Sequence, residues 1–88
     1  MATIPFQFDQ AYLIRTVTFT SVGRVIEIYE NFIVLEDAAW IADTGRFHNA
    51  LRDGELNEVE PYPNGCIVGL GAIVDAQPWI HALPLQQK

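Results

Sequence analysis

Hydrophobic and polar side chains alternate with a period of two along much of the chain, which is typical of β-strands. The alternating stretches are rich in β-branched and aromatic residues, which favour extended backbone. The predicted strands cover residues 12–20, 24–29, 32–35, 55–60 and 66–74. Residues 32–35 are apolar on both faces, as in a central strand, and the small residues within 36–41 allow a bend after it. Gly23 indicates a turn or bulge between the first two strands.

One segment repeats its apolar residues at helical spacing instead, and these residues are Phe47, Ala50 and Leu51. It predicts a helix of two to three turns, which Asp43 or Thr44 could cap and Gly54 would end. Asn64-Gly65 is typical of a tight turn before the last strand. The expected fold is therefore a single mainly-β domain, a rolled antiparallel sheet or small barrel with one short internal helix.

Both ends of the chain carry apolar residues outside this β core of residues 12–75. In residues 1–11 apolar side chains alternate around Pro5 and Gln7, and in residues 76–88 two prolines disfavour a helix. We expect two extended arms that insert between subunits or lie against the sheet. The residues expected to form this interface are Ile4, Phe6, Phe8, Trp79, Ile80, Leu83 and Leu85.

Composition points in the same direction. Half of the residues are hydrophobic and 18% are charged, against about 25% charged in an average soluble domain. The basic residues are four arginines and a single lysine, Lys88, and protein interfaces are enriched in arginine and depleted in lysine. The sequence therefore favours a structural protein that forms a homo-oligomer or decorates a larger lattice, such as a phage particle.

Charge and hydrophobicity along the sequence argue against a nucleic-acid partner, a membrane span and secretion. A net charge of −6, with no two basic residues closer than six positions apart, argues against a nucleic-acid partner. No apolar run approaches the length of a bilayer span. The first residues lack the basic and apolar regions of a secretory signal peptide. We expect the protein to stay in the cytoplasm or in a virion assembled there.

Catalytic and metal-binding patterns are absent from the sequence, so we expect no enzyme activity and no cofactor. Ser21 has no nucleophile-elbow motif around it, and His48 and His81 fit a helix surface and an arm. The lone Cys66 excludes an internal disulfide and fits a small buried hydrophobic position. Gly69-Leu70-Gly71 lacks the third glycine and the following helix of a dinucleotide fingerprint.

Asp37 is the acidic residue that most needs a partner, because it follows an apolar run. We expect a buried ion pair with Arg24 or Arg46, or backbone N–H bonds to the Asp37 carboxylate at the bend.

A second hypothesis for function is a phage-encoded binder of a small host molecule or a host protein that acts against host defence. Its anionic or aromatic ligand would contact Arg24, Arg46, Trp40 and Tyr62.

Two resemblances accompany these patterns. Residues 32–38, Phe-Ile-Val-Leu-Glu-Asp-Ala, and residues 67–73, Ile-Val-Gly-Leu-Gly-Ala-Ile, resemble the bent strand and the later glycine-containing strand of Sm-type SH3-like barrels. The Sm resemblance implies ring formation but not RNA binding, because the loops here are acidic or neutral. Residues 35–47, with Val68-Gly69, Val74-Asp75-Ala76, Trp79 and Leu83-Pro84, are similar to an uncharacterised family of small proteins in bacterial genomes and prophages. That family implies a phage or mobile-element setting and no particular activity.

Overall fold

The computed structural model describes residues 5–88, and these form six strands, one α-helix and a short 3₁₀ turn. The elements are β1 (Ala11–Thr16), β2 (Thr20–Ile28), β3 (Phe32–Asp43), α1 (Phe47–Asp53), β4 (Glu58–Pro61), β5 (Cys66–Gly69), η1 (Leu70–Ala72) and β6 (Ile73–Pro78). The predicted mainly-β fold with one short internal helix is confirmed. Ile4, which the sequence assigns to the interface, lies outside the described residues.

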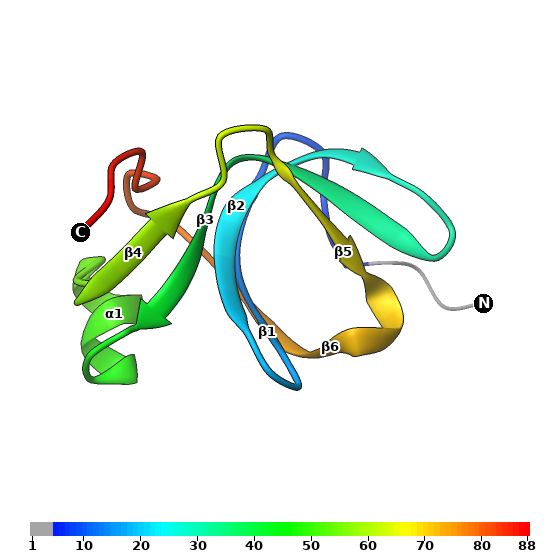
Figure 1. Ribbon diagram of the computed structural model, residues 1–88. Coiled ribbons are helices and arrows are strands. Elements are labelled where there is room, and N and C mark those ends of the chain that lie inside the picture. The colour runs from blue at the N-terminus through cyan, green and yellow to red at the C-terminus, as the bar shows by residue number, and fades with distance from the viewer. Residues whose placement is uncertain (1–4) are drawn as a thin grey trace.

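The strands form one antiparallel sheet in the order β4-β3-β2-β1-β6, and β5 also pairs with β3. The long strand β3 pairs with β2 along one side. Along its other side β3 pairs first with β5 and then, beyond a bend, with β4. Figure 1 shows how this bend rolls the sheet, so that β6 comes round beneath β5.

Among the described residues the sheet has a hydrophobic cluster on each face, because adjacent strand residues point to opposite sides. Ile14 belongs to the inner cluster, which the rolled strands enclose together with Val25, Leu35 and Val68. Leu13 belongs to the outer cluster, which is covered by α1 and the C-terminal segment. Both neighbours are fully buried, so β1 is buried on both faces. Two cores in so small a chain account for much of its hydrophobic content.

The first predicted strand, residues 12–20, is wrong because the chain turns within it. Thr16 N–H donates to the Phe19 carbonyl at 2.7 Å, and Thr16 Oγ1 accepts from Phe19 N–H at 3.0 Å. This side-chain bond offers the backbone an alternative to the ladder and ends β1. β2 therefore begins at Thr20. Gly23 lies inside β2 and not at a turn, but the register between β2 and β3 shifts between Val22 and Arg24, so the predicted bulge near Gly23 is confirmed.

The last predicted strand, residues 66–74, is also wrong. The 3₁₀ turn η1 breaks it after Gly69, and β6 then continues to Pro78, where it pairs with Tyr12 of β1. The break lets the chain cross from the edge of β3 to the edge of β1. The roll of the sheet therefore depends on this turn. The turn could not be predicted, because the residues around it are apolar like those of a strand.

The predicted helix forms, but of the predicted edge strand 55–60 only residues 58–60 are in a strand, at the start of β4. α1 ends at Gly54, whose left-handed backbone has a φ of 75°, as the sequence indicated. The N-cap position is taken by Arg46, without a side-chain cap, so the prediction that Asp43 or Thr44 caps the helix is wrong. Asp43 instead accepts a bond from Gly45 N–H at 2.8 Å within the preceding loop.

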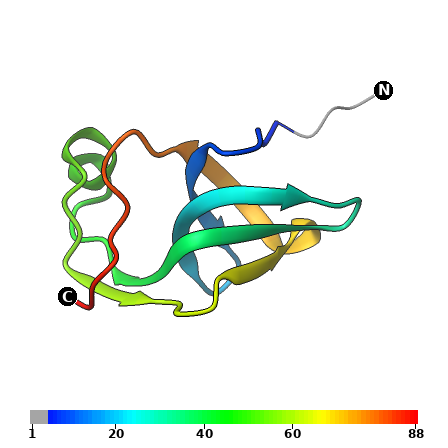
Figure 2. The same ribbon diagram turned by 90° about the horizontal axis from the view of Figure 1, so that it is seen from above.

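Both terminal segments lie on the chain's own core, which is one of the two placements that the sequence left open. Phe6 is 8% exposed and packs edge-on against the Tyr12 ring, with ring centroids 4.9 Å apart. Trp79 is 5% exposed within the outer cluster. Beyond it the C-terminal segment passes α1 and returns to β4, where Val59 and Lys88 exchange backbone hydrogen bonds of 2.9 Å (Figure 2).

Candidate functional site

The bend in β3 is a bulge at Asp37. Val22 of β2 pairs with Ala39, but Arg24 pairs with Glu36, so β3 carries one extra residue between these pairs. Asp37 occupies that interval with a φ of 51°, which is uncommon for a residue other than glycine. The bulge therefore re-aims the Asp37 side chain and lets β3 change its partner from β5 to β4.

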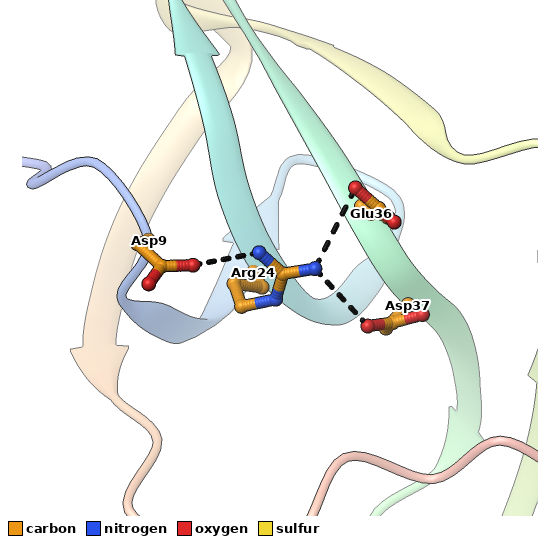
Figure 3. A network of polar contacts seen from close by, with 4 residues as sticks. All are labelled: Asp9, Arg24, Glu36 and Asp37. Atoms are coloured by element: carbon orange, nitrogen blue, oxygen red, sulfur yellow. Dashed lines mark hydrogen bonds and ion pairs between the residues drawn. The ribbon is translucent and has the colours of Figure 1, made fainter.

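Arg24 holds this bulge through three carboxylates (Figure 3). Its guanidinium nitrogens lie 2.7 Å from Asp9, 3.3 Å from Asp37 and 3.5 Å from Glu36. Asp9 also has a positive φ, 68°, and its N–H donates to the Val25 carbonyl. The hydrogen bonds that Arg24 donates, to Asp9 first and then to Asp37, raise the pKa of Arg24 above its ordinary value. Arg24 thus ties the N-terminal segment to the bulge and stays charged.

The sequence predicted a buried ion pair for Asp37. One of the two proposed partners, Arg24, is correct, but the pair is not buried. Arg24 does pair with Asp37, but 29% of the Arg24 side chain and 44% of the Asp37 side chain are exposed. Arg46 is exposed and makes no ion pair within residues 5–88. The reason is topological, because Arg46 follows the far end of β3 at the start of α1.

An open cleft of about 480 Å³ lies beside the bulge. Glu36 and Asp37 form one wall, Leu85 lines it from the C-terminal segment, and the loop of residues 61–65 forms the other wall. That loop is fixed by the bond from Tyr62 N–H to the Ala38 carbonyl, 2.8 Å long. The cleft offers carboxylates and apolar surface, so its charge does not suit an anionic ligand.

The four residues of the ligand-binding hypothesis do not converge on this cleft. Tyr62 lines it, but Arg24 is occupied by its three carboxylates and Arg46 lies beside α1. Trp40 lies on β3 with its ring edge-on to Phe19, at a centroid distance of 6.1 Å. No observation therefore favours the second hypothesis, and we do not propose it.

A second cleft, of about 330 Å³, lies between the β1–β2 turn and β5. Phe19 and Ile67 both line it, with 55% and 69% of their surfaces exposed. Trp40, which contacts Phe19, is 36% exposed. We call Phe19, Trp40 and Ile67 the apolar rim. The rim could not be predicted from the sequence, because Phe19 and Ile67 fall inside long predicted strands.

The other residues expected at an interface divide between core and surface. Leu83 packs on the outer cluster, while Phe8, Ile80 and Leu85 are 67%, 82% and 65% exposed. His81 is also engaged, since its Nε2 lies 2.7 Å from the Leu51 carbonyl.

Groups with catalytic or metal-binding potential do not gather in the described part of the chain. No group of three His, Cys, Asp or Glu residues is placed to hold a metal ion within residues 5–88. Ser21 is buried and His48 is exposed. Cys66 is half-buried, and this burial raises the pKa of its thiol, which keeps it protonated and unreactive at neutral pH.

Arg15 and Asp75 form a second ion pair, which joins β1 to β6 and which the sequence analysis missed. Arg15 Nε donates to Asp75 at 2.8 Å, and a second bond joins the same two groups. The Arg15 guanidinium also lies over the Phe47 ring of α1, 4.5 Å from its centroid. The hydrogen bond from Arg15 holds the pKa of Asp75 below its ordinary value.

This pair predicts an acid-sensitive component of stability. A carboxyl whose pKa is lower in the folded chain stabilises the fold above its unfolded pKa, and the contribution is lost as pH falls through the folded pKa. We expect Asp75→Asn to unfold at lower urea concentration than the wild type at pH 7, with the difference shrinking between about pH 5 and pH 1. Urea midpoints across this range test it, and a constant difference between the two proteins would contradict it.

Comparisons with protein-family models, with curated proteins and with solved structures found no significant match. Within residues 5–88, no helix has the length and apolar character needed to cross a membrane.

Proposed function

We propose that the protein is a non-catalytic assembly protein that associates with itself or with a larger protein lattice, such as a phage particle. The observation that supports this most is the apolar rim. Phe19, Trp40 and Ile67 stay exposed although the chain has enough apolar residues to fill two cores. Exposed apolar surface next to a cleft is typical of sites where another protein binds.

The location of the rim changes how assembly would occur. Phe6 and Trp79 are occupied within their own chain, so they are not free to bridge subunits. The rim is carried by the β1–β2 turn, β3 and β5, and the turn and β5 are on the surface (Figure 1). Association through the rim would leave the chain's own cores intact, as in a folded monomer that docks onto a second protein.

Light scattering after size exclusion tests the proposal. We expect the wild-type protein at micromolar concentration to have a mass of at least twice the 9.9 kDa of one chain. Phe19→Ser with Trp40→Ser should reduce that mass toward one chain, because both side chains contribute exposed apolar area. Ile80→Ser is the matched control, since Ile80 is 82% exposed but lies on the C-terminal segment. A wild-type mass of 9.9 kDa without any lattice partner would contradict self-association.

A further inference from the structure

Strand β5 pairs with β3 along one edge, and within residues 5–88 no strand pairs with its other edge. Ile33 lies opposite Val68, and Leu70 N–H donates to the Asn31 carbonyl at 2.9 Å. Directly opposed residues in an antiparallel pair alternate between hydrogen-bonded and non-bonded positions. The backbone groups of Val68 therefore point toward β3, and those of Ile67 and Gly69 point toward the free edge.

The side chains on this strand alternate in the same way. Ile67 and Gly69 share one face, with the Ile67 side chain 69% exposed. A Cβ atom built on Gly69 would meet no described atom within 4 Å, so the space above this glycine is open. The free edge thus presents the large apolar side chain of Ile67 and, two residues later, the open space above Gly69, which could receive such a side chain.

We propose that a second copy of this chain pairs with β5 in antiparallel orientation, about a two-fold axis at Val68. Ile67 of each copy then lies opposite Gly69 of the other and fills the open space above it. Each of these two pairs exchanges two backbone hydrogen bonds. The inference rests on the proposed self-association and identifies its surface.

Charge favours a second copy at this position. The chain has a net charge of −6, so two copies repel each other over most of their surfaces. Residues 61–74, between Glu60 and Asp75, contain no charged side chain, and β5 lies in the middle of them. Edge strands are usually protected by lysine, proline or a bulge, and Cys66–Gly69 has none of these.

The surface area that two copies could bury around their β5 strands indicates how stable the dimer is. A stable interface of standard size buries about 800 Å² per partner, roughly one seventh of this chain's 5665 Å². Paired β5 strands supply only part of that area. The remainder is available next to them, because Phe19 and Thr18 line the same cleft as Ile67. Together these surfaces can supply an interface of standard size, so we expect a dimer that stays associated at micromolar protein concentration.

Disulfide trapping tests the register. Two variants are made in a Cys66→Ser background, one with Ile67→Cys and the other with Gly69→Cys. Because residue 67 faces residue 69 of the other copy, an equal mixture should form a cross-linked dimer under mild oxidation, while each variant alone should form far less. Val74→Cys in the same background, at a position 65% exposed on β6, is the control that should not cross-link with either.

The outcomes separate this inference from the proposed function. A wild-type protein that is oligomeric by light scattering, with no preferential cross-linking in the mixture, overturns the β5 interface and leaves self-association standing. A monomeric wild-type protein overturns both. As a second measure, Ile67→Lys should raise the dissociation constant at least about tenfold, whereas Ile80→Lys, at a position 82% exposed on the C-terminal segment, should change it little. Equal dissociation constants for the two variants would overturn the interface.

Discussion

Replacing Trp79 with alanine is expected to lower the free energy of unfolding by about 3–5 kcal/mol, the usual range for truncating a buried aromatic residue. Trp79 is 5% exposed and belongs to the outer cluster with Leu13, Ile41 and Val59. Its indole N–H donates to the Ala82 carbonyl at 3.2 Å, which fixes the turn of the C-terminal segment. Removing the ring would leave a cavity between the sheet and this segment.

Urea unfolding followed by far-ultraviolet circular dichroism measures the effect. Ile80→Ala is the matched control, because Ile80 is the next residue but is 82% exposed, and we expect a change within about 0.5 kcal/mol. If the Trp79 variant proves too unstable to measure, Leu83→Ala, at a partly buried position on the same cluster, should give a smaller loss. Midpoints equal to the wild type for both Trp79→Ala and Leu83→Ala would mean that the C-terminal segment does not belong to the core.

Features that depend on local pattern could be predicted from the sequence. Phe47, Ala50 and Leu51 have helical spacing and Gly54 follows them, so both the helix and its end were correct. Leu56 and Val59 are the two apolar residues of the predicted edge strand 55–60, and both are buried. In these segments one face is buried and the other is exposed, which is the condition under which periodicity is informative.

The two broken strands could not be predicted, because the turns inside them contain apolar residues. Val17 and Phe19 are 81% and 55% exposed in the β1–β2 turn, although their residue types favour strands. The signal for this turn is the Thr16 side chain, whose Oγ1 accepts a hydrogen bond from Phe19 N–H, and many threonines lie within strands. At the second break, Leu70 begins the 3₁₀ turn within a run that is apolar on both sides.

Long-range partners were also beyond local reasoning. The ion pair of Arg24 with Asp37 was one of three alternatives, beside Arg46 and backbone N–H groups, and only the β2–β3 register places Arg24 next to Asp37. The same limit applied to Phe6 and Trp79. Their apolar character requires burial, but it does not say whether the chain itself or a second copy supplies the surface. Residue type alone therefore shows that the two terminal segments must be buried, but not which surface buries them.

Gly23→Val is expected to destabilise the fold by about 1–3 kcal/mol or more, the range for overpacking a close-packed interior. Gly23 is buried in β2, opposite the bulge of β3. A Cβ atom at this position would lie 2.9 Å from the Ala38 Cβ and 3.0 Å from the Leu35 Cβ, closer than packed carbon atoms approach. Gly71→Ala is the matched control, since a Cβ there meets no described atom within 4 Å, and it should be nearly neutral.

A double-mutant cycle identifies the contact that causes this loss. Gly23→Ala adds only the Cβ atom, and Ala38→Gly removes the atom nearest to it. If the clash with Ala38 dominates, the double variant should be more stable than the sum of the two single changes predicts, by about 0.5–3 kcal/mol, as is usual for residues in contact. Urea midpoints of the four proteins give this coupling energy. Simple additivity would instead assign the loss to Leu35 or to the backbone of β2, and the bulge at Asp37 would then not be what requires a glycine opposite it.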